Sequence, residues 1–146
     1  MTRSKRMQPI KNLADERARD AGQALALTRR AFTDHERQLA ELKAYHADYA
    51  QRVAGGAAAD GIRLQNYHAF LGRLSAAIEQ QSKLVAQARL ELERAEADWR
   101  ERHSEAGSIG KAVERIKSGE RQDADRRDQR ESDERALQNL RRTRSP

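Results

Sequence analysis

Residues 64–116 decide the fold, and they read LQNYHAFLGRLSAAIEQQSKLVAQARLELERAEADWRERHSEAGSIGKAVERI. An unbroken spacing of three and four residues picks out positions in this stretch that are all apolar except Gln81 and Arg102. A repeat averaging about 3.5 residues places a narrow apolar seam along an α-helix roughly 80 Å long. Such a seam is unstable in water, so the spacing predicts a second helix that covers it. The seam comprises Leu64, Tyr67, Leu71, Leu74, Ile78, Gln81, Val85, Ala88, Leu92, Ala95, Trp99, Arg102, Ala106, Ile109, Val113 and Ile116.

The preceding stretch, residues 14–53, carries a second seam with the same period and more polar members. This seam stops at Gly55 and Gly56, which are residues that commonly end helices, and Asp60 is a suitable N-cap for the next helix. Because the connection is short, we expect the two helices to fold back as an antiparallel αα-hairpin. The second seam comprises Ala14, Ala18, Ala21, Leu25, Thr28, Phe32, His35, Leu39, Leu42, His46, Tyr49 and Val53.

The two seams match best when the numbers of facing residues add up to about 116 or 117. A buried polar pair within such a register, here His35 with Gln81, fixes the alignment at some cost in stability. The expected fold class is all-α: a long antiparallel two-helix coiled-coil hairpin with a charged C-terminal extension. The facing pairs include Leu42 with Leu74, Tyr49 with Tyr67, His35 with Gln81, and the small Ala18 with the large Trp99.

Five consecutive parts are expected along the chain, and their bounds follow from the seams and from Pro9. Pro9 suits the first turn of a helix, where its missing N–H costs nothing. At the predicted register the first helix ends opposite about Ala106, so the later part of the long seam lacks a partner unless Met7 and Ile10 reach it. The parts are a basic N-terminal arm (1–9), the first coiled-coil helix (10–54), the hairpin turn (55–61), the second, longer coiled-coil helix (62–116), and a charged extension that is partly helical or disordered (117–146).

Composition favours an extended helical protein over an ordinary globular one, because 36% of the residues are charged, 4% are aromatic and none is cysteine. No apolar run approaches the roughly 20 residues that cross a bilayer, and no apolar segment follows the basic N-terminus. We therefore expect a cytoplasmic protein. The net charge of +6 is concentrated near the chain ends, whereas a nucleic-acid binder more usually carries a basic stripe interleaved with aromatic residues.

A second apolar row beside the seam is the most informative candidate site. It is confined to the hairpin end, and a two-stranded coil buries only its seam, so Tyr45, Phe70 and Ala77 should be at least partly exposed. One interpretation is that the row only broadens the hairpin core. The other is a partner-binding surface, because clustered exposed aromatic residues are typical interface anchors. The row comprises Gln38, Leu42, Tyr45 and Tyr49 on the first helix, and Phe70, Leu74, Ala77 and Gln81 on the second.

Catalytic and metal-binding motifs find little support. His46 and His68 could approach each other near the turn, but no carboxylate or thiolate completes a ligand set. Gly56 and Gly61 have the glycine spacing of a phosphate-binding loop, yet the required Lys and Ser or Thr do not follow. A two-helix coil offers no enclosed pocket in which pKa values could be tuned. We therefore expect no enzymatic activity, no catalytic residues, no cofactor and no metal site.

The chain resembles the FliJ family of the bacterial flagellar type III export apparatus, from about Lys11 to the C-terminus. The resemblance implies a coiled-coil stalk that binds the export ATPase FliI, its regulator FliH, the export gate protein FlhA and export chaperones, with peripheral association at the inner face of the cell membrane through the gate. It is carried by Leu13–Ala14, Arg29–Arg30, the row Gln38, Leu42, Tyr45 and Tyr49, the run Asn66–Tyr67 with Phe70, Leu74 and Ala77–Ile78, and Trp99–Arg100.

The resemblance also implies two sites. The eight-residue row matches the family's gate-binding surface, with Gln81 departing where a histidine can occur. The end that carries both termini would enter the ATPase ring through an apolar set. Two alternatives stay open: the equivalent stalk of a virulence type III secretion system, and a basic coiled-coil protein that binds nucleic acid through its termini. The ATPase-binding set comprises Ile10, Leu13, Ile109, Val113 and Ile116.

Overall fold

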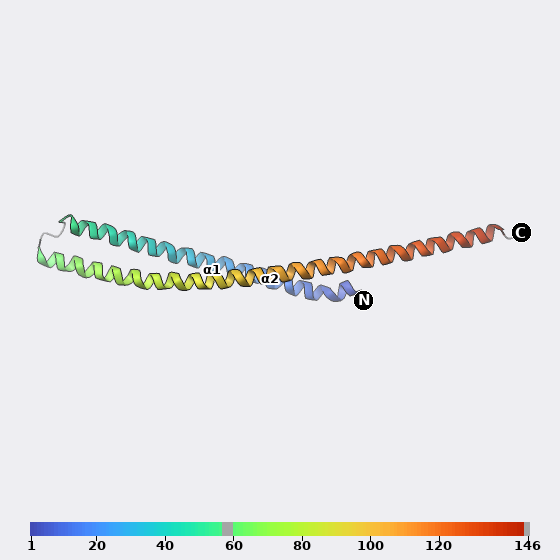
Figure 1. Cartoon of the computed structure of the whole chain (residues 1–146), viewed down its shortest axis with the longest axis horizontal. Helices are drawn as coiled ribbons and strands as arrows, with labels where there is room; N and C mark the ends of the chain where they lie inside the picture. Colours follow the sequence, from blue (N-terminus) through green and yellow to red (C-terminus); the bar gives the residue numbers. More distant parts are fainter. Residues whose placement is uncertain (57–59, 145–146) are drawn as a thin grey trace. The chain divides into compact units, whose positions relative to one another are not determined.

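The computed structural model describes residues 1–56 and 60–144, which form two α-helices, α1 (Arg3–Ala54) and α2 (Gly61–Arg144). The helices pack against each other as an antiparallel hairpin (Figure 1), which confirms the predicted all-α fold class. Their contacts divide the chain into two units. The hairpin unit is Arg19–Glu101, and the terminal unit is Met1–Ala18 with Arg102–Pro146.

The core of the hairpin unit is a single line of small and medium apolar side chains. Ala21 and Leu25 from α1 and Leu74 and Ala88 from α2 are buried, and all four belong to the predicted seams. Helices that meet along so narrow a line bury only their seam positions. Most of the remaining surface is exposed, which explains how a chain with so many charged residues can still form a stable hairpin.

Two cross-helix contacts confirm the predicted register in the hairpin unit. The ring centroids of Tyr49 and Tyr67 lie 5.0 Å apart. The side chain of Gln81 is buried, and its Nε2 lies 3.2 Å from Nδ1 of His35. The same Nε2 donates a hydrogen bond to the carbonyl oxygen of His35 at 3.1 Å. The polar pair that the sequence places in the seam is therefore satisfied inside the coil.

The large side chain of Trp99 lies against Gly22. A Cβ atom added to Gly22 would lie 3.4 Å from the indole Nε1, closer than most Cβ contacts. The seam pattern predicts a small residue opposite Trp99, and this part is confirmed. The predicted residue is Ala18, however, four positions before Gly22. Long helical side chains lean toward the N-terminus of their own helix, so Trp99 in an antiparallel pair reaches later residues of α1.

In the described part of the turn, Gly56 and Asp60 have the roles that the sequence predicts. Gly56, two residues after α1 ends at Ala54, has a φ of 82°, a left-handed conformation that favours glycine. Asp60 caps α2: its Oδ1 accepts a hydrogen bond of 2.8 Å from the N–H of Arg63, as predicted. Residues 57–59 of the predicted turn (55–61) lie outside the described residues.

The terminal unit differs from expectation at the start of α1. The predicted arm (1–9) is wrong, because α1 already begins at Arg3 and contains Pro9 in its interior. Ser4 explains this early start. Its N–H and its hydroxyl donate hydrogen bonds of 3.0 Å and 2.7 Å to the carboxylate of Glu120 on α2. The first helix therefore does not stop opposite Ala106.

The extension after residue 116, expected to be partly helical or disordered, continues α2 without interruption to Arg144. Every residue from 121 to 144 is exposed. Acid–base pairs at helical spacing support this segment, including Asp123 with Arg126 at 3.9 Å and Glu131 with Arg135 at 3.8 Å. Each such pair adds only a few tenths of a kcal/mol, so good helix-forming residues carry most of its helicity.

Within the part of the chain that the structure describes, neither helix contains a segment both long and apolar enough to cross a membrane.

Candidate functional site

An aromatic cluster joins the two helices near the turn. Tyr45 and Tyr49 lie one helical turn apart on α1, and Phe70 lies on α2. The centroid of the Phe70 ring is 6.0 Å from that of Tyr45, edge to face, and 4.6 Å from that of Tyr49. Edge-to-face and tilted pairs at these distances are favourable beyond the area they bury. The structure therefore brings the aromatic members of the predicted row together.

The predicted row divides into core and surface members. Leu74 and Gln81 are buried, so they contribute to the coil and offer little surface. Tyr45 is 49% exposed although its ring contacts those of Tyr49 and Phe70. Gln38 is also exposed, whereas the remaining four members are half-buried. The accessible surface, which we call the hairpin patch, comprises Gln38, Leu42, Tyr45, Tyr49, Phe70 and Ala77.

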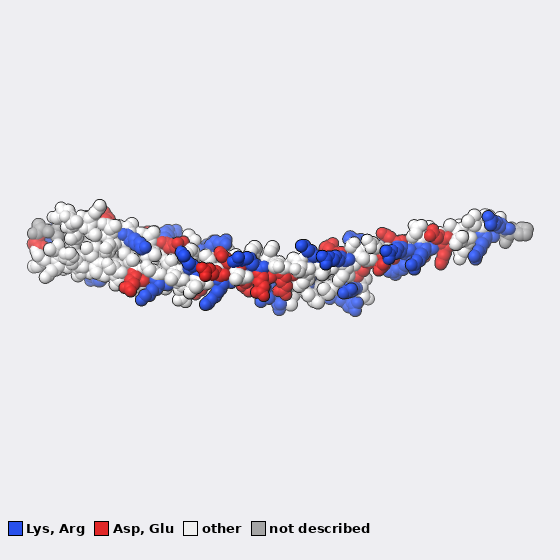
Figure 2. Space-filling model, in the orientation of Figure 1, with Lys and Arg blue, Asp and Glu red and all other residues white. Residues whose placement is uncertain are grey.

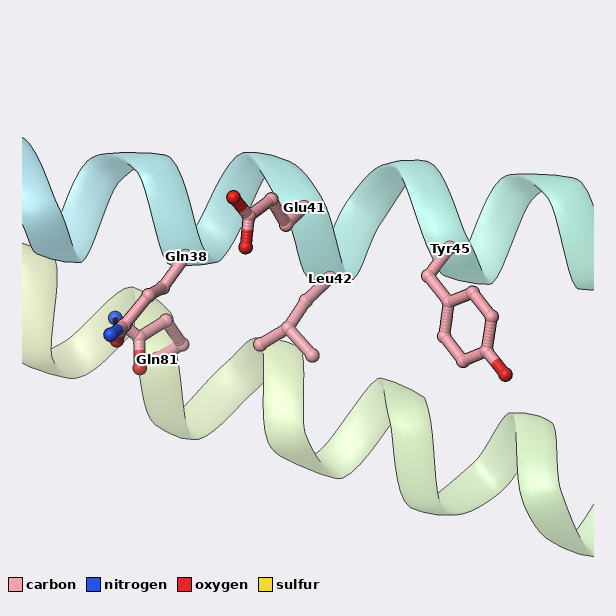
Figure 3. Close-up of a pocket in the computed structure, with 5 residues that line it drawn as sticks. All are labelled: Gln38, Glu41, Leu42, Tyr45 and Gln81. Atoms are coloured by element: carbon pink, nitrogen blue, oxygen red, sulfur yellow. Dashed lines mark hydrogen bonds between the residues drawn. The ribbon is translucent and has the colours of Figure 1, made fainter.

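A shallow hollow of about 430 Å³ lies at one side of the hairpin patch. Figure 3 shows Leu42 and Tyr45 pointing from α1 toward α2, and Gln38 pointing toward Gln81. The Nε2 of Gln81 donates a hydrogen bond of 3.3 Å to Oε1 of Gln38, and these two side chains together form one wall of the hollow. The predicted row supplies four of the lining residues, and Glu41 was missed. The hollow is lined by Gln38, Glu41, Leu42, Tyr45 and Gln81.

A second hollow, also of about 430 Å³, adjoins Phe70. We call it the arginine hollow because two guanidinium groups line it. Predictions from the seam alone missed Arg63 and Arg73. Their signal was nevertheless present: residues 63, 66, 70 and 73 follow the same three–four spacing as the seam, on the side where Phe70 lies. The arginine hollow is lined by Tyr49, Arg63, Asn66, Tyr67, Phe70 and Arg73.

The α2 segment between Arg63 and Arg73, residues 64–72, contains Phe70 and carries no acidic side chain and no Lys or Arg. On the face drawn in Figure 2, the end of the hairpin unit near the turn is accordingly almost free of charged atoms. Exposed surface that is both uncharged and aromatic is typical of protein interfaces.

The ATPase-binding set does not form an uncovered stripe as expected. Val113 is fully buried, and Ile109 and Ile116 are half-buried. The prediction that these three residues lack an intramolecular partner is wrong, because α1 extends to Arg3 and is held there by the Ser4–Glu120 contact. The other two members, Ile10 and Leu13, are 50% and 47% exposed.

The contact between Ser4 and Glu120 shifts the pKa of the Glu120 carboxyl. The Ser4 hydroxyl and then the Ser4 N–H donate hydrogen bonds that lower the pKa of the Glu120 carboxyl from its ordinary value of 4.5. The N–H of Arg3 and the positive charge of Lys117 act in the same direction. This contact fastens the first turn of α1 and does not resemble a catalytic arrangement.

His35 and His46 each make a polar contact across the hairpin. His46 lies 3.2 Å from the hydroxyl of Ser75 through its Nε2, and half-buried His35 contacts the buried Gln81. Across residues 1–56 and 60–144, no group of three or more His, Cys, Asp or Glu side chains is placed to hold a metal ion.

Fold and surface together define a class of protein: a coiled-coil hairpin with a partly exposed aromatic cluster near its turn. The chain belongs to the flagellar FliJ protein family, because the family model matches residues 3–145, essentially its whole length. Members of this family are non-catalytic components of the flagellar protein export apparatus. A search of curated proteins found no match to this chain.

Proposed function

We propose that this protein is a non-enzymatic connector of the flagellar export apparatus, binding the export gate protein FlhA through the hairpin patch and the export ATPase FliI through the terminal unit. The observation that carries the proposal is the exposed aromatic cluster. Tyr45 stays 49% exposed although it contacts both Tyr49 and Phe70. An accessible aromatic group held rigidly by its neighbours is well suited to anchor a partner.

Gate binding is assigned to the hairpin patch for two reasons. The aromatic side chains come from both helices, so the surface exists only in the folded hairpin and not in either helix alone. Buried Gln81 also fixes one wall of the adjoining hollow through its bond to Gln38. A surface whose side chains are already held in place loses less conformational entropy on binding.

ATPase binding is assigned to the terminal unit because of an exposed apolar pair on α1. Ile10 and Leu13 are half-exposed, and they lie close together on α1 at helical spacing. Val113 is buried and Ile109 and Ile116 are half-buried, so these three residues offer little surface to a partner. The regulator FliH and the export chaperones are further expected partners, and the place of action is the cytoplasmic face of the membrane next to the gate.

A binding experiment tests the two assignments separately. The purified protein is offered to the cytoplasmic domain of the gate protein and, in parallel, to the export ATPase. We expect Tyr45→Ala with Phe70→Ala to abolish gate binding and to keep ATPase binding, since these anchors lie only on the hairpin patch. Ile10→Asp with Leu13→Asp should have the opposite effect.

Circular dichroism serves as the folding control, and both variants should keep the helix content of the wild-type protein. Gate affinity that is unchanged in the Tyr45 and Phe70 variant would contradict the assignment of the hairpin patch. A wild-type protein that binds neither partner would contradict the connector function as a whole.

A further inference from the structure

The arginine hollow has a chemistry that the aromatic cluster alone does not explain. Tyr49, Tyr67 and Phe70 provide apolar surface, while Arg63 and Arg73 supply two positive charges. The ring centroids of Tyr49 and Tyr67 are 5.0 Å apart, and those of Tyr49 and Phe70 are 4.6 Å apart, so the aromatic part is tightly packed. A ligand that fits this hollow needs both an apolar group and a negative charge.

Both guanidinium groups are accessible to a ligand. Arg73 lies over the face of Phe70, with Cζ 5.9 Å from the ring centroid, which restrains its position. No carboxylate of the described residues forms an ion pair with it. Arg63 pairs with Asp60 at 3.7 Å, but both side chains are mostly exposed. Such an exposed pair is weak and is readily exchanged for another carboxylate.

The neighbouring hollow has the opposite character. It contains Glu41 and no basic residue. Tyr45 lines that hollow and Phe70 lines the arginine hollow, and the two rings are in edge-to-face contact. The hairpin patch therefore lies between a negative and a positive hollow. A charge difference of this kind fixes the direction in which a partner segment binds.

We infer that the arginine hollow binds a carboxylate-bearing segment of the gate protein whose adjoining apolar side chain packs on Tyr49, Tyr67 and Phe70. Arg63 and Arg73 are then specificity-determining residues of the gate contact, with Asn66 as a further hydrogen-bonding group. This inference rests on the proposed function and adds to it the chemistry of the bound segment.

Single-stranded nucleic acid is the other class of ligand that combines flat apolar groups with negative charge. The surroundings disfavour it. Nucleic-acid binding normally neutralises many phosphates along a basic surface, whereas this hollow has two arginines, and Glu41 and Asp60 lie on the same end of the hairpin unit. An acidic protein segment needs only one or two such charges.

The test measures affinity for the cytoplasmic domain of the gate protein by isothermal titration calorimetry, at low and at high salt. Arg63→Glu with Arg73→Glu should weaken binding about tenfold or more at low salt, because a like charge replaces each attractive one. Arg63→Gln with Arg73→Gln should weaken it less and should reduce its dependence on salt. The matched control is Arg30→Glu with Arg94→Glu, which changes the net charge equally at exposed positions outside both hollows.

Each outcome bears on a different claim. If the wild-type protein binds the gate domain and the Arg63 and Arg73 variants bind equally well, the inference is wrong and the proposed function stands. If the wild-type protein does not bind, the proposed function is wrong and the inference falls with it. Equal weakening by the control pair would reveal a general charge effect and overturn the inference. The inference would also be overturned if a fluorescent oligothymidine bound tightly to the wild-type protein and lost this binding in the Arg63 and Arg73 variants.

Discussion

Two residues far apart in the sequence, Ser4 and Glu120, determine where the paired part of the terminal unit ends. The Glu120 carboxylate accepts hydrogen bonds from the N–H and the hydroxyl of Ser4. It thereby satisfies a backbone donor that has no partner within the first turn of α1. Ser4 is buried although it lies beside basic and exposed neighbours. The contact acts as an N-cap supplied by the opposite helix.

Replacing this carboxylate should loosen the start of α1. In Glu120→Gln we expect faster amide hydrogen exchange in a peptide covering residues 1–12 at pH 7. Because folding lowers the pKa of Glu120, its stabilisation is complete above the ordinary value of 4.5 and is lost as the pH falls through the lower folded value. Hydrogen exchange of this peptide in the wild-type protein should therefore become as fast as in the variant only in acid. Exposed Glu114→Gln is the control, and equal exchange in all three proteins at pH 7 would contradict this role.

At the residue scale, contacts between seam residues can be predicted from the sequence better than contacts of residues outside the seam. The pair His35 with Gln81 could be predicted because both residues interrupt otherwise apolar seams at matching positions. Ser4 with Glu120 could not, since a serine and a glutamate among many charged residues carry no periodic signal. Arg63 and Arg73 were missed for a related reason: surface arginines are common, and only their proximity to Phe70 makes them informative.

At the scale of elements, both helices are longer than their apolar patterns predict. The seam spacing locates the paired helices and the turn, but α1 begins before its seam and α2 continues to Arg144. The extra residues of α1 are held by a polar contact with the other helix. Those of α2 are held by helix propensity and by pairs such as Glu131 with Arg135. Neither cause produces an apolar repeat, so the boundaries could not be predicted from one.

Pro9 provides a test of the extended first helix. It lies in the interior of α1 and cannot donate a backbone hydrogen bond, a defect that usually costs about 3 kcal/mol in a helix interior. Pro9→Ala should therefore slow the hydrogen exchange of residues 3–8 by roughly 10- to 100-fold. Exposed Glu16→Ala serves as the control for helix propensity alone. Exchange of residues 3–8 that stays fast in Pro9→Ala would contradict the helical start of α1 at Arg3.

At the scale of the whole molecule, the proposal depends on two contacts made by separate parts of one chain. The hairpin unit contains the aromatic cluster and both hollows, while the exposed pair Ile10 and Leu13 belongs to the terminal unit. Neither surface has residues in common with the other. Occupying one surface should therefore leave the other available, which is the requirement for a connector between an ATPase and a membrane gate.

The most direct measurement is the mass of the complex formed when this protein is mixed with the export ATPase and the cytoplasmic domain of the gate protein. We predict a ternary complex by size-exclusion chromatography with light scattering. Tyr45→Ala with Phe70→Ala should reduce it to the binary complex with the ATPase. If the ATPase and the gate domain instead displace each other from the wild-type protein, the two surfaces are not independent and the connector account is contradicted.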